Sequence, residues 1–183
     1  MEVLESDHFY HIYNRGNGKI NIYQSESNYL FFLQLLRHHI NPIGKIYAYC
    51  LLPNHFHFLI RIKEGVPKPS QAFSNMFNAY SKAFNKEHKR IGSLFQRPFK
   101  RIKVSEENYL KSLIVYIHCN PELHGIAANF SRYSFSSYQN ILSTSTTSLM
   151  RNEVIELFDD VENFELAHKY RAYDEVNKEL ILE

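Results

Sequence analysis

Two histidines, His55 and His57, stand two positions apart in the segment HFHFLIRI (55–62). Aromatic and β-branched residues dominate this segment, which predicts a β-strand. Side chains alternate along a strand, so both imidazoles point to one side of it while Phe56 and Phe58 point to the other. Two imidazoles placed in this way can bind one divalent cation. The other interpretation is a pair of polar side chains on a solvated face, and the spacing alone does not decide between them.

The elements that must position these histidines follow one another as strand, helix, strand, strand, helix and strand. The last strand contains Pro98, which predicts an edge position because proline cannot donate a ladder hydrogen bond. This order predicts an α+β fold of the ferredoxin-like, split β-α-β-β-α-β type, with an antiparallel sheet, helices on one face and further C-terminal helices. The predicted strands cover 8–14, 45–52, 55–62 and 94–104, and the predicted helices cover 25–42, 70–89 and 106–118.

Charge is distributed unevenly along the chain. Residues 1–150 hold 17 Lys and Arg against 9 Asp and Glu, whereas residues 151–183 hold 4 against 10. A basic body predicts a polyanionic partner. We expect one domain over 1–142, a Ser/Thr-rich linker over 143–150 and an acidic, helical tail over 151–183.

Composition narrows the class of protein. Hydrophobic residues make up 44% of the chain and charged residues 22%, which indicates a globular protein and excludes a disordered or fibrous one. The two cysteines, Cys50 and Cys119, lie in apolar stretches and suit a reducing compartment. The N-terminal residues do not resemble a signal peptide, and no apolar stretch is long enough to cross a bilayer. These features predict a cytoplasmic protein without a membrane partner.

Basic residues interleaved with aromatic ones are a further feature, concentrated within 82–103, where Glu87 is the single acid. This pattern is typical of a surface that binds phosphates and stacks bases. The predicted DNA-binding residues are Arg15, Lys82, Lys86, Lys89, Arg90, Arg97, Lys100 and Arg101.

Five motifs occur in order over residues 8–142: HFYHIYNRGN, YAYCLLPNHFHFLIR, NAYSKAFNKEHKRIGSLFQRPFKR, YIHCNP and YSFSSYQNIL. Together they resemble the single-tyrosine HUH transposases, and most of all the REP-associated tyrosine transposases of bacteria. The resemblance implies that His55 and His57 bind a catalytic Mg²⁺ or Mn²⁺ ion. It also implies that a tyrosine on the following helix, Tyr80, cleaves and rejoins single-stranded, hairpin-containing DNA through a 5′-phosphotyrosine intermediate.

The resemblance leaves the identity of the nucleophile and of the third metal ligand open. Tyr80 lies within an apolar helical stripe, a setting more typical of a core residue. Tyr109 and Tyr116 on the next helix are alternative nucleophiles. Phe84, one turn beyond Tyr80, cannot ligate a metal. Asn85 is the substitute ligand, although it points about 140° away from Tyr80 on an ideal helix.

Two other functions also fit the sequence: a replication-initiator or relaxase-type HUH nuclease, and a non-catalytic nucleic-acid-binding module with a ferredoxin-like fold. Formation of a covalent protein–DNA adduct would separate the enzymes from the binding module. The sequence is compatible with a monomer or a homodimer.

Overall fold

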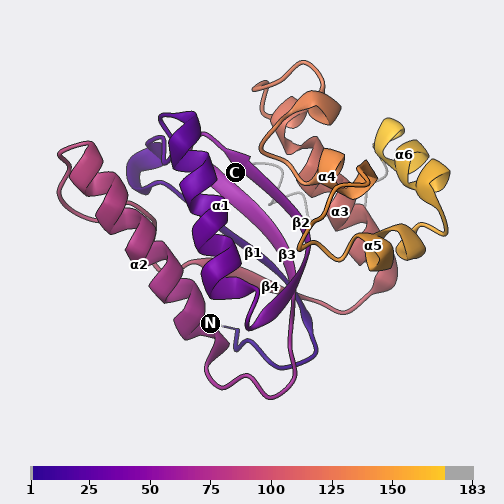
Figure 1. Ribbon diagram of the computed structural model, residues 1–183, viewed down its shortest axis with the longest axis horizontal. Helices are drawn as coiled ribbons and strands as arrows, with labels where there is room; N and C mark the ends of the chain where they lie inside the picture. Colours follow the sequence, from indigo (N-terminus) through magenta and orange to yellow (C-terminus); the bar gives the residue numbers. More distant parts are fainter. Residues whose placement is uncertain (1, 172–183) are drawn as a thin grey trace.

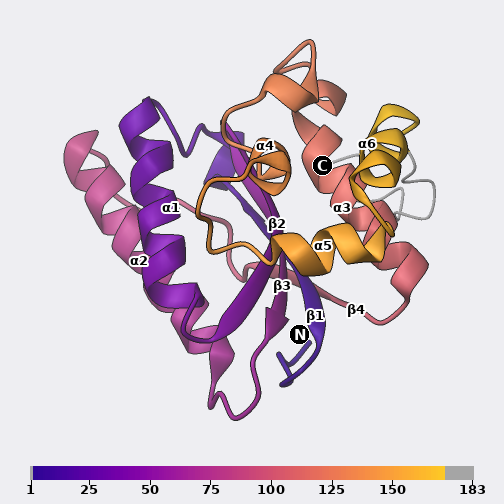
Figure 2. The same ribbon diagram turned by 45° about the vertical axis from the view of Figure 1, so that its right-hand side comes forward.

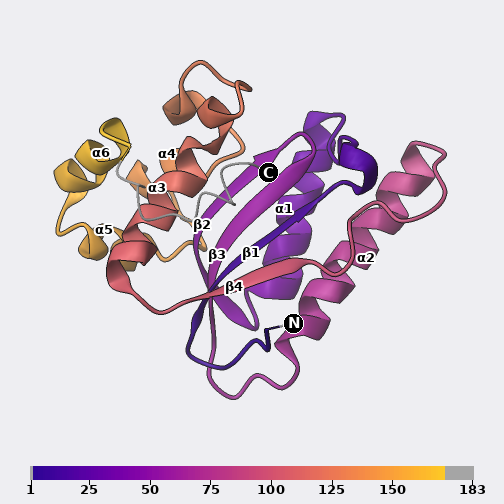
Figure 3. The same ribbon diagram turned by 180° about the vertical axis from the view of Figure 1, so that it is seen from behind.

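The computed structural model describes residues 2–171 of the chain. Its four strands form one antiparallel sheet in the order β2-β3-β1-β4 (Figure 3), which confirms the predicted ferredoxin-like arrangement. The strands are β1 (Phe9–Arg15), β2 (Gly44–Leu52), β3 (His55–Ile62) and β4 (Lys100–Val104).

Strand β4 lies at the edge of the sheet, as Pro98 predicts, but it is shorter than expected. The predicted strand began at Leu94, whereas pairing with β1 begins at Lys100. Phe95 forms an isolated bridge with Gly16 instead. Pro98 lies between the two paired regions, where its missing N–H prevents a continuous ladder.

Helices cover both faces of the sheet (Figures 1 and 2). Helices α1 (Glu26–Ile40) and α2 (Pro69–Glu87) cover one face, and α3 (Glu107–Leu123) covers the other. Three short C-terminal helices pack around α3: α4 (Tyr138–Leu142), α5 (Arg151–Leu157) and α6 (Val161–Lys169). No helix within residues 2–171 is long and apolar enough to cross a membrane.

The alternation of side chains along β3 separates two hydrophobic cores. Phe56 and Phe58 belong to the core beneath α1 and α2. Leu59 belongs to the core beneath α3, and the histidines share its side of the strand. The side of the sheet that carries the histidines is therefore the side that α3 covers.

Helix α3 is longer than the sequence predicts. The predicted helix ended at residue 118, whereas α3 continues to Leu123 with Pro121 inside it. Proline removes one helical hydrogen bond. Pro121 lies in the last turn of α3, two residues before its end, so the loss affects little of the helix. The Asn120 side chain donates from Nδ2 to the Tyr116 carbonyl at 2.8 Å. Asn120 is thereby held on the inner side of the helix, where it is fully buried.

The start of the acidic C-terminal segment packs against the domain. Glu153 in α5 accepts a hydrogen bond from Lys45 Nζ at 2.8 Å and another from the Tyr47 hydroxyl, both on β2. The predicted linker also contacts β2, because the backbone N–H of Met150 donates to the Ile46 carbonyl. Residues 172–183 of the predicted tail lie outside the described residues.

A buried hydrogen-bond chain ties α6 to α3. His168 donates from Nδ1 to the Phe164 carbonyl at 2.7 Å, so its Nε2 accepts from Nδ1 of His118 at 2.8 Å. His118 Nε2 then accepts from the Ser137 hydroxyl at 2.7 Å. This direction of donation requires both imidazoles to be neutral.

These two histidines predict a loss of stability in acid. Burial lowers the pKa of His118 well below its ordinary value and that of His168 to about 4, against about 6.5 in the unfolded chain. The unfolded state therefore takes up more protons below about pH 6.5. The stabilisation is complete above that pH, and the part that comes from His168 is lost between about pH 6.5 and 4. We expect the free energy of unfolding to fall by up to about 1.4 kcal/mol per pH unit for each histidine.

Urea unfolding over a pH series measures this dependence. His168→Gln should flatten the slope below pH 6.5, whereas exposed His38→Gln should leave it unchanged. Equal slopes for His168→Gln and the wild type would show that His168 does not titrate as described.

Candidate metal and tyrosine site

His55 and His57 lie on β3 beneath α3, with ring centroids 5.2 Å apart. Both are buried, with 7% and 1% of their surface exposed. Across the sheet, Arg15 of β1 pairs with His55 and Tyr13 pairs with His57. The predicted placement of two imidazoles on one face of a strand is confirmed.

Hydrogen bonds orient both rings. His55 Nδ1 donates to Asn54 Oδ1 at 2.6 Å, which leaves a lone pair on His55 Nε2. His57 Nδ1 lies 2.9 Å from His11 Nε2 on β1. The His57 Nε2 atom also carries a lone pair if Nδ1 donates to His11. Neither Nε2 atom has a hydrogen-bond partner within the described residues, although both are buried.

The environment keeps these imidazoles neutral. Burial, with smaller contributions from the nearby His124 and Arg15, lowers the pKa of His55 to about 3. Burial also lowers the pKa of His11 to about 3 and that of His57 well below its ordinary value. A neutral imidazole is the form that binds a metal ion.

Helix α3 brings two further side chains to the histidines. The ring of Tyr116 packs edge-on against His57, with centroids 5.7 Å apart. Asn120 follows one turn later on the same side of the helix. It lies close enough to His55 for its side chain to raise the pKa of that histidine, in opposition to burial. Its Oδ1 atom is buried without a hydrogen-bond partner among the residues that the structure covers.

These donors fit a divalent metal ion. Within residues 2–171, three buried atoms on neighbouring side chains make no well-aligned hydrogen bond, although His55 and Asn120 contact each other: Nε2 of His55, Nε2 of His57 and Oδ1 of Asn120. Two imidazole nitrogens with an amide oxygen suit Mn²⁺ or Mg²⁺ and leave other coordination positions for water or phosphate. No group of three or more His, Cys, Asp or Glu in residues 2–171 could hold a metal, so a third protein ligand beside the two histidines would have to be another residue type, such as Asn120.

A small hollow of about 30 Å³ opens beside His55 and is also lined by Arg15 and Lys100, two of the predicted DNA-binding residues. His124, at the end of α3, packs edge-on against His55 with centroids 4.8 Å apart. The hollow has room for a water molecule or an ion. Arg15 and Lys100 thus flank His55, whereas His57 does not line the hollow.

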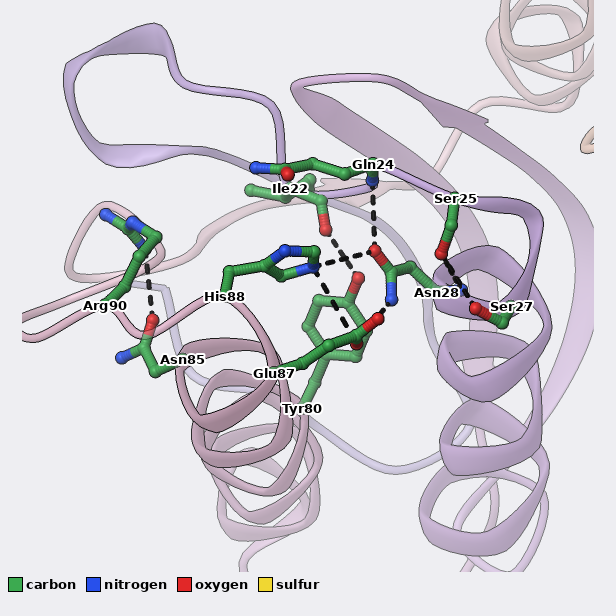
Figure 4. A network of polar contacts seen from close by, with 10 residues as sticks. All are labelled: Ile22, Gln24, Ser25, Ser27, Asn28, Tyr80, Asn85, Glu87, His88 and Arg90. Atoms are coloured by element: carbon green, nitrogen blue, oxygen red, sulfur yellow. Dashed lines mark hydrogen bonds and ion pairs between the residues drawn. The ribbon is translucent and has the colours of Figure 1, made fainter.

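Tyr80 lies on the other side of the sheet from these histidines. It belongs to the core beneath α1 and α2, where its ring packs edge-on against Phe32 at 4.8 Å between centroids. Its hydroxyl donates to the Ile22 carbonyl at 2.5 Å (Figure 4). Burial raises the pKa of Tyr80 far above its ordinary value, which disfavours a phenolate. The structure therefore does not bring Tyr80 to the histidines, because the apolar stripe of α2 covers the phenylalanine side of β3.

Asn85 is also far from a metal-binding position. Its Nδ2 donates to the Gly92 carbonyl at 2.9 Å, and its Oδ1 accepts from Arg90 at 3.0 Å (Figure 4). Both ends of the amide hold the loop after α2, in the layer opposite α3. The prediction of Asn85 as a metal ligand does not fit this geometry.

The predicted DNA-binding residues divide into three groups. Arg15 and Lys100 lie beside His55, as described above. Arg97 and Arg101 line a larger groove between α2 and β4. The remaining four lie on the last turns of α2 and the loop that follows, away from the histidines: Lys82, Lys86, Lys89 and Arg90.

Sequence reasoning missed the roles of His11 and Asn120 and ranked Tyr116 below Tyr80. Tyr116 and Asn120 both fall within YIHCNP, one of the motifs behind the resemblance. Their spacing of four residues places them on one helix face, which is a signal readable from the sequence. His11 gave no such signal, because its contact with His57 depends on the pairing of β1 with β3.

No model of a known protein family matches the chain, and no curated protein matches it in sequence. Among solved structures, it is similar to one described as a REP-associated tyrosine transposase bound to a REP hairpin, with a TM-score of 0.62 at 18% sequence identity. The match covers 79% of this chain and 84% of that chain. The chain therefore shares the α+β fold of that transposase.

Proposed function

We propose that this protein is a metal-dependent enzyme that cleaves and rejoins single-stranded, hairpin-containing DNA, with Tyr116 as the nucleophile. His55, His57 and Asn120 are the proposed metal ligands. The observation that carries the proposal is that three buried atoms able to bind a metal, with no well-aligned hydrogen bond among the described residues, lie close to a tyrosine. The fold shared with a transposase that binds a REP hairpin supports DNA as the substrate.

The proposed reaction is a transesterification at one phosphodiester. A bound Mg²⁺ or Mn²⁺ ion would stabilise the negative charge that develops on the scissile phosphate. The Tyr116 oxygen forms a bond to phosphorus as the bond from phosphorus to the 3′ oxygen breaks. The tyrosine loses its proton and the released 3′ oxygen gains one. The 5′ end stays attached as a phosphotyrosine, so a later attack by a 3′ hydroxyl can rejoin the strand.

Neighbouring side chains support this reaction by position and charge. In the proposed tautomer, His57 Nδ1 donates to His11 Nε2, which leaves the Nε2 lone pair of His57 for the metal. Arg15 and Lys100 place positive charge beside His55, where the phosphate of the strand would enter. Such contacts hold a nucleic-acid backbone without reading its sequence.

Entry of DNA requires a change of shape. Tyr116 is fully buried, and the hollow beside His55 is too small for a phosphodiester. His124 and Arg15 adjoin His55 at this point, and α3 covers the rest of the site. An outward displacement of these side chains or of the end of α3 would admit the strand, as closing elements do in many enzymes.

A denaturing gel tests the proposal. The full-length protein is incubated with a labelled DNA hairpin carrying single-stranded extensions, with Mg²⁺ or Mn²⁺ and with EDTA. We expect a covalent protein–DNA adduct that needs the metal ion. Absence of an adduct with every hairpin and either metal would contradict the proposal.

The burial of Tyr116 and His57 favours one alternative, a non-catalytic DNA-binding protein in which the histidines serve only as core residues. Such a protein would shift the same hairpin on a native gel without forming an adduct. The buried Nε2 atoms of His55 and His57 and the Oδ1 atom of Asn120 argue against this alternative. Buried polar atoms without partners reduce stability, unless they bind a ligand.

A substitution at His11 tests the proposed metal site while leaving all three proposed metal ligands in place. We expect His11→Phe to raise the Mn²⁺ concentration needed for half-maximal adduct formation by about 10–100-fold, because His57 loses its hydrogen-bond acceptor. Adduct yield should recover at saturating Mn²⁺. An unchanged metal dependence would show that His11 does not orient His57.

A further inference from the structure

A groove of about 510 Å³ is lined by α2 and by the segment leading into β4. Figure 3 shows α2 beside this segment. One wall is formed by α2, with Ser74, Asn78 and Ser81. The other wall is the stretch 95–99. We call this hollow the edge groove. Its volume falls within the range of about 300–1,000 Å³ typical of pockets for small ligands.

The floor of the edge groove is aromatic. Phe77, Phe95 and Phe99 line it and are largely buried. The ring of Phe77 packs against the other two, with centroids 5.5 and 5.4 Å away. Aromatic surfaces of this kind bind nucleobases by stacking, without regard to which base is present.

The rim of the edge groove is polar and cationic. The Arg101 guanidinium lies 4.3 Å above the Phe99 ring and donates to Ser70 Oγ at 2.7 Å. Arg97 on the facing segment is exposed. No acidic side chain lines the groove among the residues that the structure describes. The rim therefore favours an anionic ligand.

The hydroxyl groups of α2 add acceptors for hydrogen bonds. Ser74 Oγ donates to the Ser70 carbonyl at 3.0 Å and Ser81 Oγ to the Phe77 carbonyl at 2.7 Å. With their protons used in this way, both oxygens can accept from the edge of a base. Exposed Asn78 offers both a donor and an acceptor. An aromatic floor, polar walls and two arginines match the base and the phosphate of a nucleotide.

The edge groove adjoins the candidate metal site. Asn14 and Gln96 line both the groove and the small hollow beside His55. A strand held at His55 can therefore pass around the β4 edge into the groove. We propose that the edge groove binds one unpaired nucleotide of the DNA strand, next to the phosphodiester that is cleaved. This inference rests on the proposed function, because the groove lies next to the site where a DNA strand is proposed to be cleaved.

Equilibrium binding tests the inference separately from catalysis. Fluorescence anisotropy is measured with a DNA hairpin that carries single-stranded oligothymidine extensions, and with versions that have one abasic site at each extension position. Asn78→Trp should fill the groove. Asn75→Trp is the matched control, because Asn75 is an exposed asparagine of the same helix that does not line the groove.

We expect one abasic position to weaken wild-type binding by roughly tenfold, as loss of a stacked base does. Asn78→Trp should weaken binding of the intact hairpin by a similar factor and of that abasic hairpin hardly at all. Asn75→Trp should behave as the wild type. Equal binding by the two variants, or no sensitive position in the wild type, would overturn the inference. Failure of the proposed function would show instead as a missing covalent adduct, whatever the anisotropy reports.

Discussion

Replacing Tyr116 with phenylalanine should abolish the covalent protein–DNA adduct while leaving hairpin affinity within a few-fold of the wild type. The substitution removes the one atom that can bond to phosphorus and keeps the ring that packs against His57. Affinity should persist because it comes mainly from cationic contacts to the DNA backbone. The measurement is the adduct yield on a denaturing gel beside the Kd from anisotropy.

Tyr80→Phe is the matched control, because it removes the same hydroxyl from another fully buried tyrosine. It leaves the Ile22 carbonyl without its partner and should cost about 1 kcal/mol of stability. Adduct formation should be retained, since Tyr80 lies on the other side of the sheet. An adduct with Tyr116→Phe and none with Tyr80→Phe would reverse the assignment.

Removing either His55 or His57 should reduce adduct formation nearly as much as removing the Tyr116 hydroxyl. We expect His55→Ala and His57→Ala each to weaken Mn²⁺ binding by more than about 100-fold, beyond the loss that an orienting neighbour causes. Adduct formation should disappear at ordinary metal concentrations, and hairpin binding should change little. Mn²⁺ titration calorimetry and the gel assay report the two effects separately.

The control for this pair is His38→Ala, which removes an exposed histidine from the end of α1. Its metal binding and adduct yield should equal those of the wild type. His55 borders the hollow, so its removal should disturb packing less than removal of His57, and circular dichroism checks that both variants fold. Unchanged Mn²⁺ affinity in folded His55→Ala would contradict the metal site.

The sequence predicted the sheet and its helices because hydrophobic periodicity marks each of them. Alternation along β3 was enough to place His55 and His57 on one face and Phe56 and Phe58 on the other. The same reasoning could have rejected Tyr80. Its helix carries an apolar stripe, and such a stripe must cover the phenylalanine side of the strand, not the histidine side.

Other parts of the site depend on contacts between distant segments, which local patterns do not report. The hydrogen bond between His57 and His11 joins β3 to β1, and the proximity of Asn120 to His55 depends on how α3 crosses the sheet. The length of α3 was also underestimated. A proline normally signals the end of a helix, but Pro121 is buried in the last turn, where the missing hydrogen bond matters least.

The position of the DNA linkage identifies the nucleophile. Trypsin cleaves after Lys and Arg, so the three candidate tyrosines fall in separate peptides: Tyr80 in 64–82, Tyr109 in 104–111 and Tyr116 in 112–132. Each of these peptides contains a single tyrosine. Mass spectrometry of the nuclease-trimmed adduct should find the nucleotide on peptide 112–132, at Tyr116. A nucleotide on peptide 64–82 or 104–111 would contradict the assignment of Tyr116 as the nucleophile.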